Sequence, residues 1–467
     1  MKKVIKIVCL VTVLTLLAGM FTGCGKVNDK DDQGRTMISV GNWPAKEGAD
    51  LTATLARKER FEQANPDVVV EGDPWTFDRK TFYAKAAGDQ LPTVYMTAFT
   101  EVPEIIESEY SADLTDVLKK RGYEGMFNEK ILAAVSDKDG NIMGFPYSAY
   151  VLGLAYNVDL LEKAGLMEAD GTPKQPKDWN EVTEFAVKIK EATGKPGFIM
   201  PTANHVGGWY FTNIAWSFGV DFMEKGEDGK WKANFNTAEA VQALQWVKDL
   251  KWKYNVLPEN NIVDMTELYK VYATGGAGML MAAGDGAKRV VQYGMDPQHF
   301  GMMAIPAGPK RHVTLLGGSS WYLKPEATKD QIDAGVRWLE TAYNFNLTEE
   351  YKTNAIAKYD KWLGENRVVG VKEMSCWSEN SEALAWEHKY IDEHTNINMN
   401  HVRLYNEFCA NCPAEIQAEE PVCCQELYGI LDNCLQEVLS NKDADCVAVL
   451  EKANSDFQSN YLDNLTY

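Results

Sequence analysis

Short runs of mostly apolar residues recur near the start of the chain. Residues 37–40, 68–70 and 94–96 are each bounded by polar or turn-forming residues. Runs of this length, rich in Val, Ile, Met and Tyr, are typical of strands. The sequence therefore predicts three strands in this region.

Amphipathic stretches of helical length lie between these runs. Leu51, Leu55 and Phe61 fall on one face of a predicted helix, which ends at Asn65-Pro66 because the residue before a proline is disfavoured in a helix. The alternation of strands with helices favours an α/β fold built in layers.

Further helices are predicted along the rest of the chain. Asp178 is a candidate N-cap with an acidic residue three positions later, and its helix is predicted to close near Gly194. Residues 332–339 have apolar positions at helical spacing. Residues 425–440 and 444–458 show clear apolar faces, which predicts two helices at the C-terminus.

One stretch briefly imitates a calcium-binding loop. Asp137, Asp139 and Asn141 have the spacing of the first three ligands, but Ile142 stands where the loop needs glycine and Ser148 where it needs glutamate. We interpret this stretch as a hairpin turn, and no metal site is predicted.

The N-terminus has the pattern of a bacterial secretion signal. Three lysines fall within the first six residues, and the apolar run at residues 7–20 is short for a membrane span. Cys24 follows Thr-Gly, which resembles a lipobox, in which the cysteine becomes the lipidated first residue. The alternative is an ordinary signal peptide with an incidental cysteine. We predict a signal peptide over residues 1–23 and a lipid-anchored, flexible tether over residues 24–35.

The chain carries a large excess of negative charge. It has 67 acidic and 47 basic residues, which gives a formal net charge of −20 at pH 7. Such a chain is a poor candidate for binding nucleic acid or an anionic membrane surface. Only ten of the basic residues are arginine, the usual side chain for holding carboxylates and phosphates. The composition therefore favours an uncharged ligand.

Aromatic residues are abundant for so polar a chain, with 13 Trp, 21 Tyr and 17 Phe. Sugar rings stack on aromatic faces through their C–H groups, while sugar hydroxyls need Asp, Asn and backbone partners. A secreted chain rich in Trp and poor in Arg fits that demand. The alternative to sugar binding, for any single aromatic residue, is packing in the hydrophobic core.

Catalytic motifs are missing from the sequence. It contains no Gly-x-Ser-x-Gly, no His-Glu-x-x-His and no phosphate-binding loop. Glu387, His388, Asp392 and His394 cluster, but their spacing matches no familiar metal site, and we interpret them as a solvated helix face. No motif suggests the paired carboxylates of a glycosidase. We predict a protein that is not an enzyme and needs no cofactor.

The cysteines leave three interpretations open. Besides Cys9 and Cys24 there are seven, six of them within residues 409–446. Their spacing would allow a metal or iron–sulfur site. A secreted protein would favour disulfides. The positions of some of them on apolar helix faces favour buried free thiols. The seven are Cys376, Cys409, Cys412, Cys423, Cys424, Cys434 and Cys446.

Three stretches carry a more specific signal. The first, residues 144–181, contains GFPY, YNVDL and PKDWNE; the second, residues 275–286, contains GGAGMLM and GDG; the third, residues 301–321, contains GMMAIPAGP and LGGSSW. In this order they resemble the extracellular solute-binding proteins of the carbohydrate ABC importer class, in which maltose-binding protein is a distant member. The resemblance extends over nearly the whole mature chain.

That resemblance implies a two-lobed periplasmic-binding-protein-like fold of type II, with the ligand cleft between two α/β lobes. The roughly 430 residues after the tether suit two domains. The chain would cross between the lobes three times, near Tyr150, Ser320 and Met374. Lobe one would comprise residues 36–150 and 320–374, and lobe two residues 151–319 and 375–467.

The resemblance also implies a function. The chain would be the substrate-binding lipoprotein of an ABC transporter, which captures a sugar or oligosaccharide outside the cell and delivers it to the transmembrane subunits of the permease. It would be a monomer, held to the cell membrane by the lipid on Cys24, and would bind no nucleic acid. A peptide, an amino acid or a polyamine is the alternative ligand, and a secreted glycosidase is a further alternative.

Candidate ligand-binding residues follow from the fold class, because open α/β sheets bind ligands at the carboxyl ends of their strands. Tyr210, Asp285, Trp43 and Phe99 also match the family's ligand loops, and Tyr210 with Trp43 or Phe99 would supply two stacking faces. The full predicted set is Trp43, Asp73, Trp75, Thr97, Phe99, Tyr147, Tyr150, His205, Trp209, Tyr210, Asp285 and Trp321.

Overall fold

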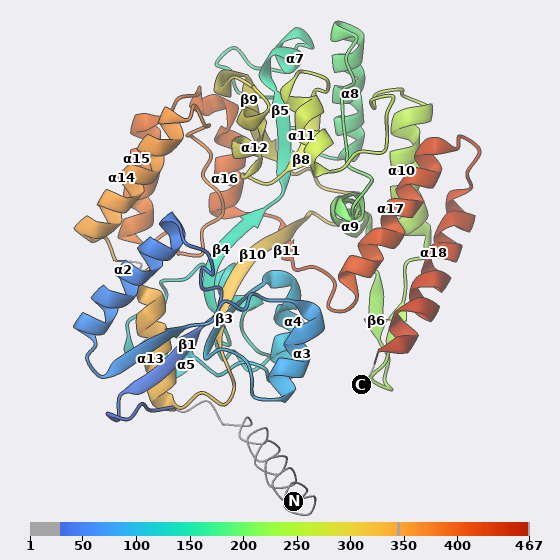
Figure 1. Ribbon diagram of the computed structural model, residues 1–467. Helices are drawn as coiled ribbons and strands as arrows, with labels where there is room; N and C mark the ends of the chain where they lie inside the picture. Colours follow the sequence, from blue (N-terminus) through green and yellow to red (C-terminus); the bar gives the residue numbers. More distant parts are fainter. Residues whose placement is uncertain (1–28, 343–345, 466–467) are drawn as a thin grey trace, which may run out of the picture.

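The computed structural model of the chain describes residues 29–342 and 346–465 (Figure 1). The predicted signal peptide and Cys24 lie outside the described residues. Among the helices that the structure does describe, none is both long and apolar enough to cross a membrane.

A mixed sheet forms the centre of one half of the molecule, called lobe one below. The predicted strands are confirmed as β1 (Thr36–Val40), β2 (Val68–Gly72) and β3 (Val94–Ala98), and β1 pairs in parallel with the other two. The sheet continues into β10 (Val313–Leu323), which is antiparallel to β3 and to β4 (Phe145–Val151). Lobe one therefore has a mostly parallel sheet whose far edge is antiparallel.

Helices cover both faces of this sheet (Figure 1). On one face lie α2 (Ala49–Ala64) and α13 (Lys329–Glu340), and on the other α3 (Arg79–Ala87) and α4 (Val102–Glu107). The helix predicted to stop before Pro66 does so, with Asn65 as its C-cap.

The predicted apolar face of α2 is only partly correct. Phe61 is buried against Trp338, whereas Leu55 is 49% exposed. Only the side of α2 around Phe61 packs on the lobe, so the Leu55 side chain is left in solvent.

A smaller sheet forms the centre of the other half, called lobe two below. Its strands are β8 (Met279–Ala282), β5 (Gly153–Asn157) and β9 (Phe300–Ala304), and the central β5 is antiparallel to both neighbours. The helices around it are α7 (Val158–Lys163), α8 (Trp179–Thr193), α9 (Val206–Phe218), α10 (Ala238–Trp252), α11 (Met265–Ala273), α12 (Gly286–Gln292), α16 (Arg403–Asn411), α17 (Cys424–Ser440) and α18 (Cys446–Asn460).

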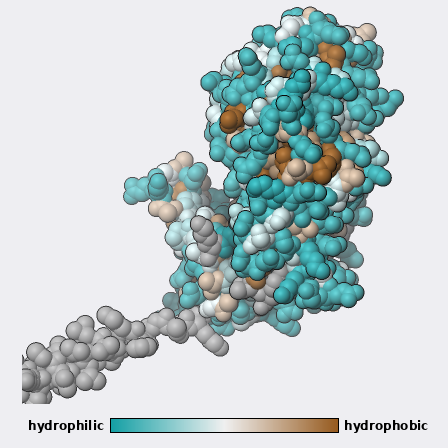
Figure 2. Space-filling model, turned by 90° about the vertical axis from the view of Figure 1, so that its right-hand side faces the viewer, coloured by the Kyte–Doolittle hydropathy of each residue, from teal (hydrophilic) through white to brown (hydrophobic). Residues whose placement is uncertain are grey.

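Several of these helices begin and end as the sequence predicts. The Asp178 carboxylate accepts hydrogen bonds from the first turn of α8, and Gly194 ends the helix in a left-handed conformation. The two predicted C-terminal helices are α17 and α18, which lie on the face shown in Figure 2. That face is mainly hydrophilic, with small hydrophobic areas.

The calcium-like stretch is a turn, as predicted. The Asp137 carboxylate accepts hydrogen bonds from the backbone N–H groups of Asp139 and Asn141. Ser136 and Ile142 form an antiparallel bridge around it.

Three segments connect the lobes. Strand β4 passes into β5 through the single residue Leu152. The second connection is strand β10, which pairs with β11 (Glu415–Gln417) at its start and with the lobe-one strand β3 at its end. The third connection precedes α16 in the sequence. Trp377, at its start, stacks on Phe127 of lobe one with ring centroids 5.1 Å apart, and α16, at its end, packs on β9 of lobe two.

Two helices that lie in the sequence between β10 and α16 form a separate pair. These are α14 (Glu349–Gly364) and α15 (Glu382–His394), which share a small core of Tyr359, Val369 and Ile391. Glu387 accepts a hydrogen bond from the Tyr359 hydroxyl at 2.6 Å and its side chain is only 18% exposed. The interpretation of residues 387–394 as a solvated face is therefore wrong for Glu387, because α14 covers it.

The seven cysteines in the described part of the chain are free thiols. Burial raises the pKa of Cys376 to about 12 and that of Cys423 to about 11. Within residues 29–342 and 346–465, no group of three or more His, Cys, Asp or Glu side chains is arranged to hold a metal ion. Of the three interpretations, the structure has free thiols, six of them buried and Cys423 partly buried.

Candidate functional site

Tyr150 lies where the two lobes meet. Its ring covers Gly317 of β10, where an added Cβ would stand 2.1 Å from a ring carbon, so the site needs glycine there. Burial raises the pKa of Tyr150 to about 12, and the carboxylates of Glu419, Asp285 and Glu373 act in the same direction. The charges of three acidic side chains from separate segments therefore act on one lobe-one tyrosine.

Two tyrosines of lobe two are hydrogen-bonded to each other. Tyr210 on α9 and Tyr269 on α11 are both buried, and burial raises the pKa of each hydroxyl. Asp285, which precedes α12, pairs with Arg289 at 2.9 Å, and the Arg289 guanidinium lies 5.5 Å from the Tyr269 ring centroid. The Asp285–Arg289 pair is about two-fifths exposed, so the buried tyrosines have a charged, solvent-accessible rim.

Glu419 links the two lobes directly. One carboxylate oxygen accepts a hydrogen bond from the Thr100 hydroxyl of lobe one at 2.7 Å. The other accepts from the indole N–H of Trp209 on α9 of lobe two at 2.8 Å. The Trp209 ring in turn packs edge-on against Tyr210 at 4.8 Å.

A cavity of about 320 Å³ opens between β4, the start of α12 and the α14–α15 pair. Tyr147 lines it from lobe one and is 41% exposed. Trp362 lines it from α14, and the Lys288 ammonium group of lobe two lies 5.0 Å from that indole. The cavity therefore combines aromatic surface with a charged side chain.

Glu373 forms part of the wall of the same cavity. Burial raises the pKa of its carboxyl group, and Lys288 opposes that effect. An added Cβ at Gly284 would stand 2.4 Å from the Glu373 side chain, so glycine at position 284 makes room for this carboxylate.

The structure brings five predicted residues to the junction between the lobes. Tyr150, Trp209, Tyr210 and Asp285 lie around the carboxylates described above, and Tyr147 lines the cavity.

Three other predicted residues lie nearby but are buried. Trp321 is 6.5 Å from Tyr147, Thr97 pairs with Ser320 across the sheet, and Phe99 is 1% exposed in the core.

The remaining four predicted residues are not brought into this group. Trp43 covers Gly72 and stacks on Trp338 at 5.9 Å. Asp73 accepts the backbone N–H of Trp75, whose ring stacks on Phe82.

His205 lies at the N-cap of α9, where its backbone N–H donates to the carboxylate of Asp432 on α17. The contacts of all four thus lie within their own lobe.

Sequence reasoning missed five residues of this region. Tyr269, Lys288, Trp362, Glu373 and Glu419 come from five separate segments. Glu373 directly precedes the predicted third crossing near Met374, which is the one sequence signal pointing to it, whereas Trp362 lies on the helix before that crossing.

Residues 45–344 match the family described as bacterial extracellular solute-binding protein. The putative ABC transporter periplasmic-binding protein YcjN of Escherichia coli (strain K12) is 26% identical over 298 residues, which are 62% of this chain and 65% of that protein. The chain thus spans less than two thirds of the length of this relative. The sn-glycerol-3-phosphate-binding periplasmic protein UgpB of Escherichia coli O1:K1 / APEC is 25% identical over 66% of this chain and 70% of that protein.

The fold is shared with a solved sugar complex. Maltose-bound MalE3 of T. maritima aligns with a TM-score of 0.60 at 20% identity, over 90% of this chain and 99% of that one. This likeness confirms the predicted two-lobed, type II periplasmic-binding-protein-like fold.

Proposed function

Because the chain belongs to the bacterial extracellular solute-binding protein family, we propose that it is the sugar-binding subunit of an ABC importer. It captures a sugar or oligosaccharide outside the cell, between its lobes, and delivers it unchanged to the transmembrane subunits of a permease. It is a binding protein rather than an enzyme.

The observation that carries this proposal is the mixture of aromatic and charged groups at the lobe junction. Tyr147 offers an exposed ring and Trp362 a partly buried one to the cavity. Glu419, Glu373 and Asp285 offer carboxylates near Tyr150. Aromatic faces suit the C–H faces of a sugar ring, and ionised carboxylates accept strong hydrogen bonds from its hydroxyls.

The same composition weighs against the other ligand classes. A polyamine site would be lined by carboxylates alone, whereas Lys288 and Arg289 accompany the carboxylates here. An amino acid or peptide needs a fixed partner for each charged end. The one arginine beside the tyrosines, Arg289, already pairs with Asp285.

We further propose the arrangement of the chain relative to the membrane. Residues 1–23 are a signal peptide, Cys24 carries the lipid anchor, and residues 24–35 are the tether. The lobe boundaries are those given by the sequence, with residues 36–150 and 320–374 in lobe one. The protein acts as a monomer.

A thermal-shift screen tests the proposed ligand class. A ligand that binds only the folded state raises the melting temperature, and at one hundred times its Kd it stabilises the protein by about 2.7 kcal/mol. The panel contains mono- and oligosaccharides, amino acids, dipeptides, spermidine and glycerol 3-phosphate. At least one sugar should give the largest shift. A shift with spermidine, an amino acid or a peptide and with no sugar would refute the proposal.

A further inference from the structure

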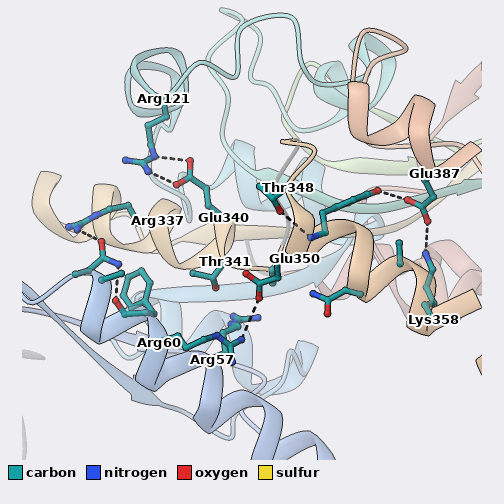
Figure 3. A pocket seen from close by; sticks show the side chains of 17 residues that line it. Arg57, Arg60, Arg121, Arg337, Glu340, Thr341, Thr348, Glu350, Lys358 and Glu387 are labelled. Atoms are coloured by element: carbon teal, nitrogen blue, oxygen red, sulfur yellow. Dashed lines mark hydrogen bonds and ion pairs between the residues drawn. The ribbon is translucent and has the colours of Figure 1, made fainter. Parts of the chain in front are cut away.

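A cavity of about 610 Å³ lies outside the lobe junction, between α2, α13 and α14 (Figure 3). Charged side chains line it, and they already have partners in ion pairs: Arg121 with Glu340, Arg337 with Asp67, and Lys358 with Glu387. These pairs balance one another, so the larger cavity gives no reason to expect a charged or strongly polar ligand.

The smaller cavity at the lobe junction, of about 320 Å³, contains a carboxylate in a different situation. Within residues 29–342 and 346–465, the Glu373 side chain takes part in no hydrogen bond and no ion pair. Water reaches it through the cavity, yet the protein surrounds it closely enough that burial raises the pKa of its carboxyl group. An enclosed charged group without a partner is costly, so this carboxylate is suited to bind a ligand.

Lys288 lines the same cavity from lobe two. Its positive charge opposes the rise in the Glu373 pKa, so the two charges act on each other. No ion pair joins them in the described part of the chain, so more than 4.0 Å separates the ammonium nitrogen from the carboxylate oxygens. The ammonium group instead lies 5.0 Å from the centroid of the Trp362 ring. The cavity thus has a charged donor and a charged acceptor that are held apart.

A donor and an acceptor of opposite charge suit the hydroxyl groups of a sugar. Each hydroxyl both donates and accepts, so adjacent hydroxyls of one ring can donate to a carboxylate and accept from an ammonium group. Hydrogen bonds with one charged partner are roughly twice as strong as neutral ones. A charged ligand would fit less well, because its own charge would be repelled by one member of the pair.

The volume of this cavity limits the length of the ligand. It lies near the lower end of the range of ordinary small-molecule sites, roughly 300–1,000 Å³. A cavity of this size suits one or two sugar rings better than a long oligosaccharide.

We propose that Glu373 and Lys288 select a neutral mono- or disaccharide by binding two adjacent hydroxyl groups of one ring. Tyr147, which is 41% exposed, provides an aromatic face beside them. Trp362 is a positioning residue, because its ring holds the Lys288 ammonium group by a cation–π interaction. This inference rests on the proposed function and adds to it the size, the charge and the contacts of the sugar.

Isothermal titration of the purified chain tests the proposal. Glucose, galactose, mannose, maltose and sucrose are the neutral probes, glucosamine and glucuronate are charged relatives of glucose, and maltoheptaose is the long probe. Each is titrated into the wild type, Glu373→Gln, Lys288→Met, Trp362→Ala and Trp362→Phe. The matched controls are Glu382→Gln and Trp386→Ala, because Glu382 is exposed and Trp386 is half-buried on α15 and neither lines the cavity.

At least one neutral mono- or disaccharide should bind the wild type and both controls equally well, and more tightly than the charged and long probes. Glu373→Gln and Lys288→Met should each weaken that binding at least about tenfold, the loss expected for a hydrogen bond to a charged group. Trp362→Ala should weaken binding about as much as Lys288→Met. Trp362→Phe keeps a ring face for the ammonium group and should recover most of the affinity.

Unchanged affinity of Glu373→Gln or Lys288→Met for a sugar that the wild type binds would overturn this inference and leave the proposed function standing. Tighter binding of maltoheptaose, glucosamine or glucuronate would also overturn it. If no sugar binds, the proposed function fails and this inference fails with it. Circular dichroism checks folding, and if a Trp362 variant does not fold, Glu373→Gln and Lys288→Met decide.

Discussion

The Tyr210 side chain is 2% exposed and packs edge-on against Trp209 at the lobe junction. Truncation of a buried aromatic ring leaves a cavity and typically costs 3–5 kcal/mol. We therefore expect Tyr210→Ala to lower the free energy of unfolding by about 3–5 kcal/mol, measured by urea denaturation of the ligand-free protein.

Tyr210→Phe is the control for this prediction, because it keeps the ring and removes only the hydroxyl group. It should cost less than the truncation, about 1–3 kcal/mol, because it leaves the buried Tyr269 hydroxyl without its hydrogen-bond partner. If Tyr210→Ala were instead as stable as the wild type, the ring would not be part of the core, and a direct stacking role for it in sugar binding would be favoured.

Glu420 is expected to make stability depend on pH. Its carboxyl group is 7% exposed and accepts a hydrogen bond from the Trp216 indole at 2.9 Å. Burial raises the pKa of Glu420 to about 7, and the bond from Trp216 only partly opposes this. The folded state then holds a proton that the unfolded state releases near its ordinary pKa of 4.5. Stability should therefore fall as the pH rises from about 4.5 to about 7.

The variant Glu420→Gln isolates this effect, because an amide does not titrate. The free energy of unfolding is measured for both proteins between pH 4 and pH 8. The wild type should lose stability relative to Glu420→Gln as the pH rises through this window. A difference that stays constant with pH would show that the Glu420 pKa is not raised.

At the residue scale, some residues of the lobe junction could be predicted from the sequence and others could not. Tyr147 and Tyr150 could be predicted as junction residues because β4 precedes a crossing between the lobes. Asp285 could be predicted because it follows β8. Trp43 and Trp75 also follow strands, yet they pack on Trp338 and Phe82, because a strand end does not specify which way a large ring turns. Glu419 carries no local signal, since its role depends on segments more than 200 residues away.

The segment between β11 and α17 is the element that ties the two lobes together through Glu419. Hydrogen bonds to a charged group are worth about 1.5–3 kcal/mol each. We expect Glu419→Ala to loosen the ligand-free protein and shift it at least about tenfold toward an open arrangement. Small-angle X-ray scattering should record a larger radius of gyration than in the wild type.

Glu415→Ala is the matched control for this experiment. Glu415 lies on β11 in the same segment, but its partner is Arg311 and it is 54% exposed. Its loss should leave the radius of gyration unchanged. If Glu419→Ala and Glu415→Ala scatter identically, the contact with Thr100 and Trp209 does not hold the lobes together.

At the element scale, local patterns predicted most of the framework. The caps of α8 and the three N-terminal strands carry their signals within a few residues. The α14–α15 pair was harder, because its core depends on contacts between two helices. Glu387 appears solvated in the sequence, yet Tyr351, Lys358 and Tyr359 all pair with its carboxylate. A charged residue in a helix gives no local sign that another helix covers it.

For the whole molecule, the proposed location depends on Cys24. Cys24→Ser should move the protein from the membrane fraction to the soluble fraction, because serine cannot take a thioether-linked lipid. The affinity for ligand should not change, because the proposed anchor precedes residue 29 and the part of the proposed tether that the structure describes packs on lobe one, where Lys30 pairs with Asp330. Membrane retention of Cys24→Ser would show that lipidation at this residue is not what holds the protein.

The two lobes and their three connections also define how the molecule should work. A ligand that contacts both lobes binds the closed arrangement more tightly and shifts the population toward it. Tyr147 and Tyr150 come from β4, whereas Lys288, Asp285 and Trp209 come from lobe two. A sugar between these residues would hold both sides together.

The most direct test of sugar capture is isothermal titration of the purified mature chain with the best sugar from the thermal-shift screen, followed by chromatography of the recovered ligand. Our prediction is saturable binding of one sugar molecule per chain and recovery of that sugar unchanged. Absence of heat with every sugar while an amino acid, peptide or polyamine binds, or recovery of hydrolysed sugar, would contradict it.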